Sequence, residues 1–188
     1  CINNIDPRGV YSAVLGLLKI DGQAVNQFRP YRPRISGYTH LMHPKKHGYP
    51  YVQSIRSMLG FCDEVIVING DPSDSDESMD DLRDELTTEI ASGQLKVIDH
   101  EWDPEEPGMD GMQKAFGRAM VSADAEFLWQ QDADEIVHER DYKKIYDVCR
   151  RFPTDVDVVH LPVVELWGDD RHARTDRHSW KWRLSRNN

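Results

Sequence analysis

Apolar and polar positions follow two patterns, which alternate along the chain. Short apolar runs are typical of strands, and they are separated by segments in which apolar residues recur every three or four positions, as in helices. The run EVIVIN at 64–69 is nearly continuous and β-branched, which predicts a strand buried on both faces. The runs that predict strands are 35–43, 64–69, 95–99, 126–131 and 156–164.

Helical spacing occurs between these strands. The stripes are Val52, Ile55 and Leu59, with Gly60 placed to end the helix; Leu82, Leu86 and Ile90; Met112, Ala115, Phe116, Ala119 and Met120; and Tyr142, Ile145, Cys149 and Phe152. Strands that alternate with helices indicate βαβ crossovers. We therefore expect an α/β fold with a mostly parallel sheet covered by helices on both sides.

The length of 188 residues suits one domain. We interpret residues 1–34 as a preamble or linker, because the prolines of QFRPYRPR favour an extended chain, and residues 35–188 as the domain. The chain begins at Cys1 without a signal pattern and stops at Asn188 without a tail. We therefore expect an excerpt of a longer protein, with the domain truncated at its C-terminus.

Charge and composition reduce the number of functions that the chain could have. A formal net charge of -10 argues against broad nucleic-acid binding, which needs a basic face. The longest apolar run, 10–18, is about half of the ~20 residues that span a bilayer, so we expect no transmembrane segment. The 3 cysteines are widely spaced and odd in number, which favours reduced thiols and a cytoplasmic location.

Acidic residues gather where the predicted strands end, which is where open α/β sheets bind ligands. GDPSDSD follows 64–69, and DADE follows 126–131. The carboxylates of Asp132, Asp134 and Glu135 repel one another unless a cation, a proton or open water relieves them. Hard oxygen ligands suit Mg²⁺ or Mn²⁺ together with substrate phosphates. A solvated strand-to-helix turn with an acidic N-cap is the alternative.

Three segments carry a resemblance to a known family. Residues 111–141, GMQKAFGRAMVSADAEFLWQQDADEIVHERD, resemble the middle of the family 2 glycosyltransferases, where a helix leads to an apolar strand and then to Asp-x-Asp. Residues 35–76 look like that family's opening, and KWRLSRNN at 181–188 is similar to its later Lys/Arg-rich strand. The resemblance covers about 35–188. It implies a GT-A (Rossmann-like) three-layer αβα sandwich.

The resemblance also implies a hexosyltransferase-like reaction. A sugar would move from a nucleotide-diphosphate donor to a hydroxyl of a glycan, lipid or other acceptor, with Mn²⁺ or Mg²⁺ as cofactor. Asp132 would face the ribose or the metal, Asp134 would ligate the cation that bridges the diphosphate, and Glu135 would support the loop or a ligand water. Lys114 and Arg118, one helical turn apart, would present positive charge to the diphosphate unless they form a solvated helix face.

Nucleotide-binding and catalytic roles are implied in the same way. Asp71 or Asp74 would match the acidic turn near the base, although both also suit local Asx-turns, and Thr39 would lie where the nucleotide pocket begins. His43 stands where family members often have Asn. An inverting reaction needs a carboxylate base to deprotonate the acceptor. The candidates for that base are Glu165, Asp169, Asp170 and His172.

Two other functions remain open. A nucleotidyltransferase would use a similar sheet, but it needs a Gly-rich basic loop after the first strand, for which HLMHPKKHG is a poor match. A non-catalytic domain that binds a glycan or a partner is the other alternative. Trp167, Trp180 and Trp182 suit either stacking on sugar rings or packing in a core or interface.

Overall fold

The computed structural model describes residues 31–188 except 104, 177 and 178. The predicted preamble therefore lies almost entirely outside the described residues. Arg32–Asn188 forms one unit, separate from Cys1–Tyr31. Its first strand begins at Ile35, where the sequence predicts that the domain starts.

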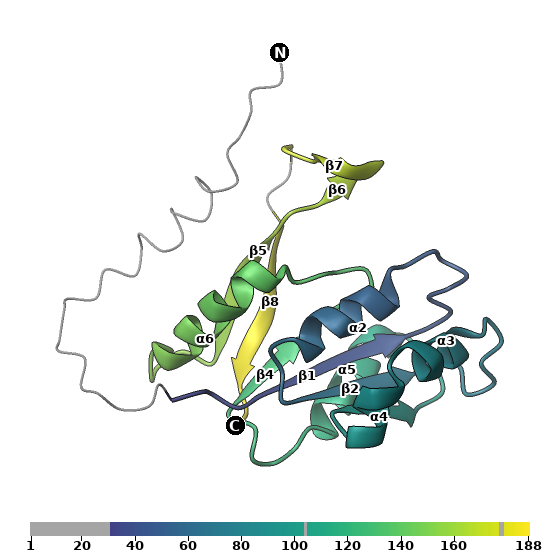
Figure 1. Cartoon of the computed structure of the whole chain (residues 1–188), viewed down its shortest axis with the longest axis horizontal. Helices are drawn as coiled ribbons and strands as arrows, with labels where there is room; N and C mark the ends of the chain where they lie inside the picture. Colours follow the sequence, from purple (N-terminus) through teal and green to yellow (C-terminus); the bar gives the residue numbers. More distant parts are fainter. Residues whose placement is uncertain (1–30, 104, 177–178) are drawn as a thin grey trace. The chain divides into compact units, whose positions relative to one another are not determined.

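The centre of this unit is a six-stranded sheet in the order β3-β2-β1-β4-β8-β5 (Figure 1). Its strands are β1 (Ile35–Leu41), β2 (Glu64–Asn69), β3 (Leu95–Asp99), β4 (Phe127–Gln130), β5 (Val158–Val163) and β8 (Ser179–Arg186). β1 pairs in parallel with β2 and β4, and β2 does so with β3. β8 is antiparallel to both β4 and β5, so it alone runs against the others. The predicted mostly parallel α/β sheet is confirmed.

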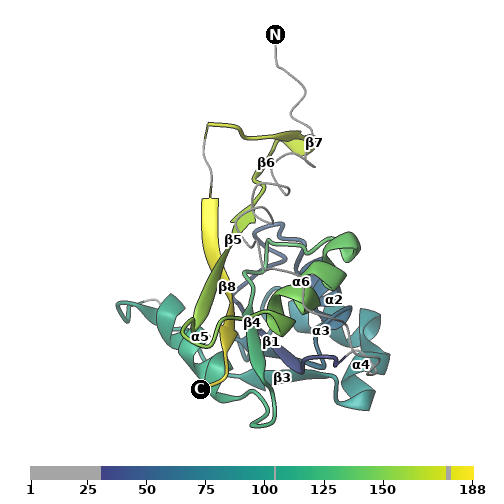
Figure 2. The ribbon, with the colours of Figure 1, turned by 90° about the vertical axis from the view of Figure 1, so that its left-hand side faces the viewer.

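Helices cover both faces of the sheet. They are α2 (Tyr51–Leu59), α3 (Ser78–Glu85), α4 (Thr87–Ser92), α5 (Met109–Ala119) and α6 (Tyr142–Arg150), with a 3₁₀ turn η1 (Glu139–Asp141). Figure 2 shows α5 on one side of the sheet and the other helices on the opposite side, which confirms the three-layer sandwich. None of the helices in the described part of the chain is both long and apolar enough to cross a membrane.

Two apolar clusters hold the layers together. The larger lies against α2 and α6, where the ring of Phe61 packs edge-on against Trp129 with 5.0 Å between centroids. The smaller lies under α5 and includes Ile66 and Ile68. All residues of β2 are buried, as its continuous apolar run predicts. Each fully buried isoleucine stabilises the fold by roughly 1.5–3 kcal/mol.

The face of α5 that packs on the sheet differs from the predicted stripe. Met112 and Met120 are 46% and 38% exposed, whereas the buried residues are Met109, Gln113 and Gly117. The backbone of α5 lies close to the sheet, because a Cβ at Gly117 would come within 3.2 Å of the nearest side chains. Gln113 and Gly117 lie at the centre of this contact face beside Met109, and of the predicted stripe Phe116 packs against the smaller cluster, so a search for apolar residues finds the face only in part.

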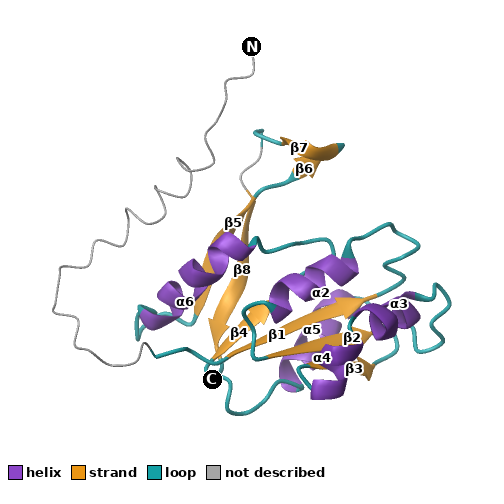
Figure 3. Cartoon of the chain, viewed as in Figure 1, coloured by secondary structure: helices purple, strands orange, loops and turns teal. Residues whose placement is uncertain are grey.

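Two further differences concern the predicted elements. The stripe Leu82, Leu86 and Ile90 belongs to two helices, because Leu86 leaves the helical region at φ -123° and ends α3 before α4 begins. A two-stranded sheet of β6 (Leu166–Trp167) and β7 (Asp169–Ala173) connects β5 to β8 and was not predicted (Figure 3). β6 has only 2 residues, and β7, DDRHA, is almost entirely polar, so neither gives an apolar run that predicts a strand.

Candidate functional site

The acidic turn lies at the carboxyl edge of the sheet, beside the point where the strand order reverses. β2 and β3 lie on one side of β1, and β4 lies on the other. Such a switch point is where open α/β sheets bind their ligands. β4 ends at Gln130, and the antiparallel β8 runs past the turn that follows. Side chains from α5, the turn and β8 therefore meet there.

Asp132 is surrounded by cationic side chains. Its Oδ2 lies 2.7 Å from Arg183 Nη2 and 3.2 Å from Lys181 Nζ. Its Oδ1 lies 3.3 Å from Lys114 Nζ and accepts a hydrogen bond of 2.9 Å from Gln130 Nε2. Both carboxylate oxygens are thus engaged by groups of the chain itself.

Glu135 shares two of these cations. Its Oε1 lies 2.6 Å from Arg183 Nη2 and 2.8 Å from Lys181 Nζ, so both cations bridge Glu135 and Asp132. Alternate residues of a strand point to the same face, which explains why Lys181 and Arg183 reach the turn together. The repulsion expected within DADE is relieved here by cations from β8, which lie about fifty positions along the chain.

These charges reinforce one another. Burial by itself would raise the pKa of Asp132, but the nearby Arg183, the hydrogen bond from Gln130, and Lys114 and Lys181 together hold it well below its ordinary value. Burial lowers the pKa of Arg183, and its bonds to the two carboxylates raise it by more. The groups therefore stay ionised at neutral pH. Removing one partner would leave a poorly compensated charge in a partly buried place.

Asp134 differs from its two acidic neighbours. Its side chain is exposed and makes no hydrogen bond or ion pair with any residue that the structure describes. Within the same residues no three Asp, Glu, His or Cys side chains are arranged to hold a metal ion. Mg²⁺ and Mn²⁺ often use only one or two protein carboxylates together with phosphate oxygens, so the donor types of Asp132 and Asp134 fit such an ion. Asp132 would have to exchange its present partners.

Gln131 anchors the acidic turn to α2, a role that the sequence analysis missed. Its Nε2 donates to the carbonyl oxygen and hydroxyl of Ser54, at 3.0 and 2.9 Å, and to the carbonyl oxygen of Glu135 at 2.9 Å. Its Oε1 accepts from Trp129 Nε1 at 2.9 Å. Gln131 is 1% exposed. The only sequence signal for this role is an amide placed directly after an apolar strand, in QQDADE.

The acidic loop after β2 makes local bonds. The carboxylate of Asp71 accepts hydrogen bonds from Ser73 and Ser75, which lower its pKa to about 2. Asp74 accepts from the backbone N–H of Met79 at 2.9 Å and of the following residue at 3.2 Å, near the start of α3. Both carboxylates thus satisfy backbone or hydroxyl donors of their own loop, as in the Asx-turn interpretation.

Buried polar atoms without partners occur near the same edge. Thr39 Oγ1 and His40 Nδ1 on β1 have no hydrogen bond to any described residue. His40 Nε2 lies 3.2 Å from Asp110 at the start of α5. An unpaired buried polar group costs about 1–3 kcal/mol. Thr39 therefore has an unused hydroxyl where the sequence predicts the nucleotide pocket to begin.

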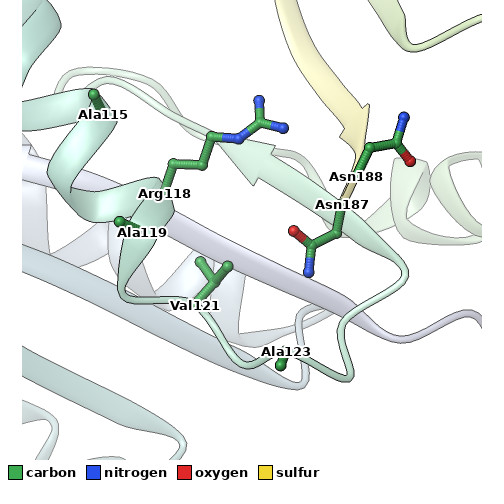
Figure 4. Close-up of a pocket in the computed structure, with 7 residues that line it drawn as sticks. All are labelled: Ala115, Arg118, Ala119, Val121, Ala123, Asn187 and Asn188. Carbon is green, nitrogen blue, oxygen red and sulfur yellow. The ribbon is translucent and has the colours of Figure 1, made fainter.

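Lys114 and Arg118 lie in different surroundings. Lys114 reaches Asp132 and also pairs with Asp110 at 2.9 Å. Arg118, one turn further along α5, lines a cavity of about 350 Å³ together with Asn187 and Asn188 (Figure 4). The residues after β8 lie at the opposite edge of the sheet, because β8 is antiparallel to β4. Of the two predicted cations, the structure brings only Lys114 to the acidic turn.

The candidate bases lie on the connection between β5 and β8, which starts at the same edge. Glu165 Oε1 accepts a hydrogen bond from the hydroxyl of Ser179 at the start of β8. Asp169 is exposed, and its Oδ1 lies 2.7 Å from His172 Nδ1. Asp170 lies on β7. Neither the Glu165 nor the Asp169 carboxylate contacts the acidic turn in the described structure.

Three tryptophans in the C-terminal part of the chain have side chains that are largely exposed to solvent. Trp167 is 68%, Trp180 51% and Trp182 46% exposed. The guanidinium of Arg174 lies 5.3 Å from the centroid of the Trp167 ring. Packing in a core, which the sequence analysis gave as one alternative to stacking on sugar rings, does not occur for these rings within the described residues. Stacking on a sugar stays a prediction.

No family model and no curated protein sequence matches the chain. Among solved structures it is similar to the mannosyltransferase PcManGT from Pyrobaculum calidifontis in complex with GDP-Man and Mn²⁺, with a TM-score of 0.51 and 17% identity over 85% of this chain and 43% of that one. It is also similar to 4-diphosphocytidyl-2C-methyl-D-erythritol synthase from Anaerococcus prevotii, with a TM-score of 0.50 and 14% identity over 82% of this chain and 70% of that one. The chain therefore has a nucleotide-diphospho-sugar transferase-like fold, and the predicted GT-A type of α/β fold is confirmed.

Proposed function

We propose that this domain is the donor-binding part of a metal-dependent glycosyltransferase, which moves a sugar from a nucleotide-diphosphate donor to an acceptor hydroxyl. The observation that carries the proposal is the position of Asp132 at the switch-point edge, with cations from α5 and β8 around it. The similar mannosyltransferase holds GDP-Man and Mn²⁺, which supports a donor and metal of this kind. The chain spans 43% of that protein, so the activity of a whole enzyme belongs to the proposal.

Asp132 and Asp134 are the proposed ligands of Mn²⁺ or Mg²⁺. When bound, the ion would stabilise the charge that develops on the leaving diphosphate. Lys114 approaches from the N-terminal half of α5 and would add a charge-assisted hydrogen bond to a phosphate oxygen. Arg118 faces the distant cavity, so we assign it no contact with the diphosphate.

The nucleoside would lie across the ends of β1 and β2. Thr39 offers its unpaired hydroxyl, and Asp71 lies two residues after the end of β2, where its backbone N–H donates to Asn69. Among the candidate bases we favour Glu165, because its partner Ser179 lies two residues before Lys181 on β8. An ionised Glu165 would deprotonate the acceptor hydroxyl in an inverting reaction, with Asp169 and Asp170 as the other candidates.

A nucleotidyltransferase is the second candidate, because the similar synthase is matched over 70% of its own length. The loop after β1 argues against it. Lys45 Nζ lies 3.4 Å from Glu77 and 3.2 Å from Asp81. The backbone N–H groups of Lys45 and Lys46 donate to Asp76. The Lys45 ammonium and the two backbone N–H groups that would bind a triphosphate are thus already paired with acidic residues.

Calorimetric titration separates these candidates. Nucleotide sugars and nucleoside triphosphates are titrated into the chain with Mn²⁺ and with EDTA. We expect metal-dependent binding of a nucleotide sugar that is lost in Asp134→Ala. Asp124→Ala is the matched control, because Asp124 is an exposed carboxylate paired with Arg34 before β4. Tight binding of a triphosphate without any nucleotide sugar would favour the nucleotidyltransferase, and no binding to the folded chain would contradict both.

A further inference from the structure

One of the two Asp132 oxygens that a metal ion would use, Oδ2, is already bound by the cations of β8. Arg183 and Lys181 both contact Oδ2 of Asp132, and both also contact Oε1 of Glu135. A divalent ion placed at Asp132 would therefore compete with two positive charges. Without a further anion, it would also be repelled by them and by Lys114, which lies 3.3 Å from the other oxygen.

Arg183 has capacity for another acceptor. Its side chain is 6% exposed, and its Nε has no partner among the described residues, while Nη1 and Nη2 bind Gln130, Asp132 and Glu135. A buried guanidinium N–H without an acceptor is costly, and arginine binds phosphate oxygens in a bidentate manner. The unpaired Nε therefore points independently to an anionic ligand beside the acidic turn.

We propose that Lys181 and Arg183 occupy the metal site in the free protein and pass to the donor diphosphate when the metal ion binds. The ion then binds Asp132, while Lys181 and Arg183 remain paired with Glu135. The diphosphate replaces Asp132 as the second anionic partner of the two cations. This inference rests on the proposed function and deepens it. It makes Lys181 and Arg183 positioning residues that couple metal binding to donor binding.

Such an exchange has a measurable consequence. The metal alone binds weakly because it must displace Lys181 and Arg183, and the diphosphate alone binds weakly because both cations are already paired. Together they satisfy every charge, so each tightens the binding of the other by the same factor. We expect that factor to be about tenfold or more, within the usual range of coupling between sites.

The test measures Mn²⁺ binding by electron paramagnetic resonance of the free ion, without nucleotide. Lys181→Gln removes one competing cation at a side chain that is 39% exposed, so the fold should tolerate it. We expect it to tighten Mn²⁺ binding by about threefold or more and to weaken the binding of GDP, UDP and CDP in the presence of Mn²⁺. Lys143→Gln is the matched control, because Lys143 is 84% exposed on α6 and pairs with Asp147.

Three results decide the matter. Mn²⁺ affinity that is unchanged or weaker in Lys181→Gln overturns the inference, even where a nucleoside diphosphate binds the wild-type chain and so supports the proposed function. Tighter Mn²⁺ binding with no nucleoside diphosphate bound by the wild type overturns the transfer to diphosphate together with the proposed function. Arg183→Lys keeps the charge and loses the bidentate geometry, so we expect wild-type Mn²⁺ affinity with weaker diphosphate binding; tighter Mn²⁺ binding in this variant also overturns the inference.

Discussion

Gln130 and Gln131 are neighbours in the chain, yet they lie in opposite environments. Gln131 joins a neutral network on the α2 side of the sheet, where its amide binds Ser54, Trp129 and Glu135. Gln130 lies on the α5 side and bridges the charged groups of Asp132 and Arg183. The pleat of one strand separates a network of neutral groups from a cluster of ions.

The two sides also differ in how well their polar groups are satisfied. The buried side-chain atoms without partners in the described chain are Thr39 Oγ1, His40 Nδ1, His100 Nδ1, Gln113 Oε1 and Arg183 Nε. All but Thr39 belong to residues that lie on α5, contact it or contact the acidic turn. A satisfied network fixes one geometry, whereas unpaired groups and ions can exchange partners. We infer that the α2 side holds the turn in place and the α5 side binds the metal ion and the diphosphate.

The largest effect is expected from a substitution in the charged cluster on the α5 side of the sheet. Asp132→Ala removes the proposed metal ligand and leaves Arg183 with Glu135 as its one anionic partner among the described residues. We expect donor affinity to fall by about 100-fold or more, and the free energy of unfolding to fall by about 2 kcal/mol. Calorimetry and urea denaturation measure the two effects. Wild-type donor affinity in a folded Asp132→Ala protein would contradict the assignment.

A somewhat smaller effect is expected on the neutral side. Gln131→Leu removes the acceptor of the Trp129 ring N–H and one of the bonds made by both the hydroxyl and the carbonyl of Ser54, so we expect a loss of about 2 kcal/mol in the free energy of unfolding. Gln94→Leu is the matched control, because Gln94 Nε2 also donates to two carbonyl oxygens, remote from the turn. Both variants should lose stability, but only Gln131→Leu should also weaken donor binding.

The contact between α5 and the sheet gives the next effect. A Cβ at Gly117 would lie 3.2 Å from Ile68 Cγ1 and Tyr38 Cδ2, so Gly117→Ala should push α5 away from the sheet. Gly111 lies on the same helix with open space around it. We expect Gly111→Ala to stabilise the protein by about 0.5–1 kcal/mol and Gly117→Ala to be less stable than Gly111→Ala by about 1 kcal/mol. Equal melting temperatures of the two variants would refute the close approach.

The smallest effect concerns pH. The pKa of Asp71 is lowered to about 2 in the folded protein, against about 3.9 for an unperturbed aspartate. Its contribution to stability is therefore complete above about pH 4 and is lost as the pH falls toward 2. Because solvent screens a loop carboxylate, we expect about 1 kcal/mol. Urea denaturation of the wild type and Asp71→Asn should converge in stability between pH 5 and 2; a constant difference would rule out the shift.

The sequence predicts the sheet far better than it predicts the site. The runs at 64–69 and 95–99 match β2 and β3 to the residue, because short apolar runs bounded by turn residues predict strands. The contacts of Lys181 and Arg183 with Asp132 cannot be predicted from apolar patterns, since they depend on the antiparallel register of β8 against β4. The buried face of α5 is predicted only in part, because Gln113 and Gly117 belong to it and lie outside the apolar stripe that the sequence shows.

The most direct test of the account compares the affinity of the wild-type chain for nucleoside diphosphates with Mn²⁺ and with EDTA. The account predicts that Mn²⁺ tightens the binding of at least one of GDP, UDP and CDP by about tenfold or more, and that Lys181→Gln reduces this factor. Equal affinities with Mn²⁺ and with EDTA would contradict a metal ion and a diphosphate sharing the edge beside Asp132.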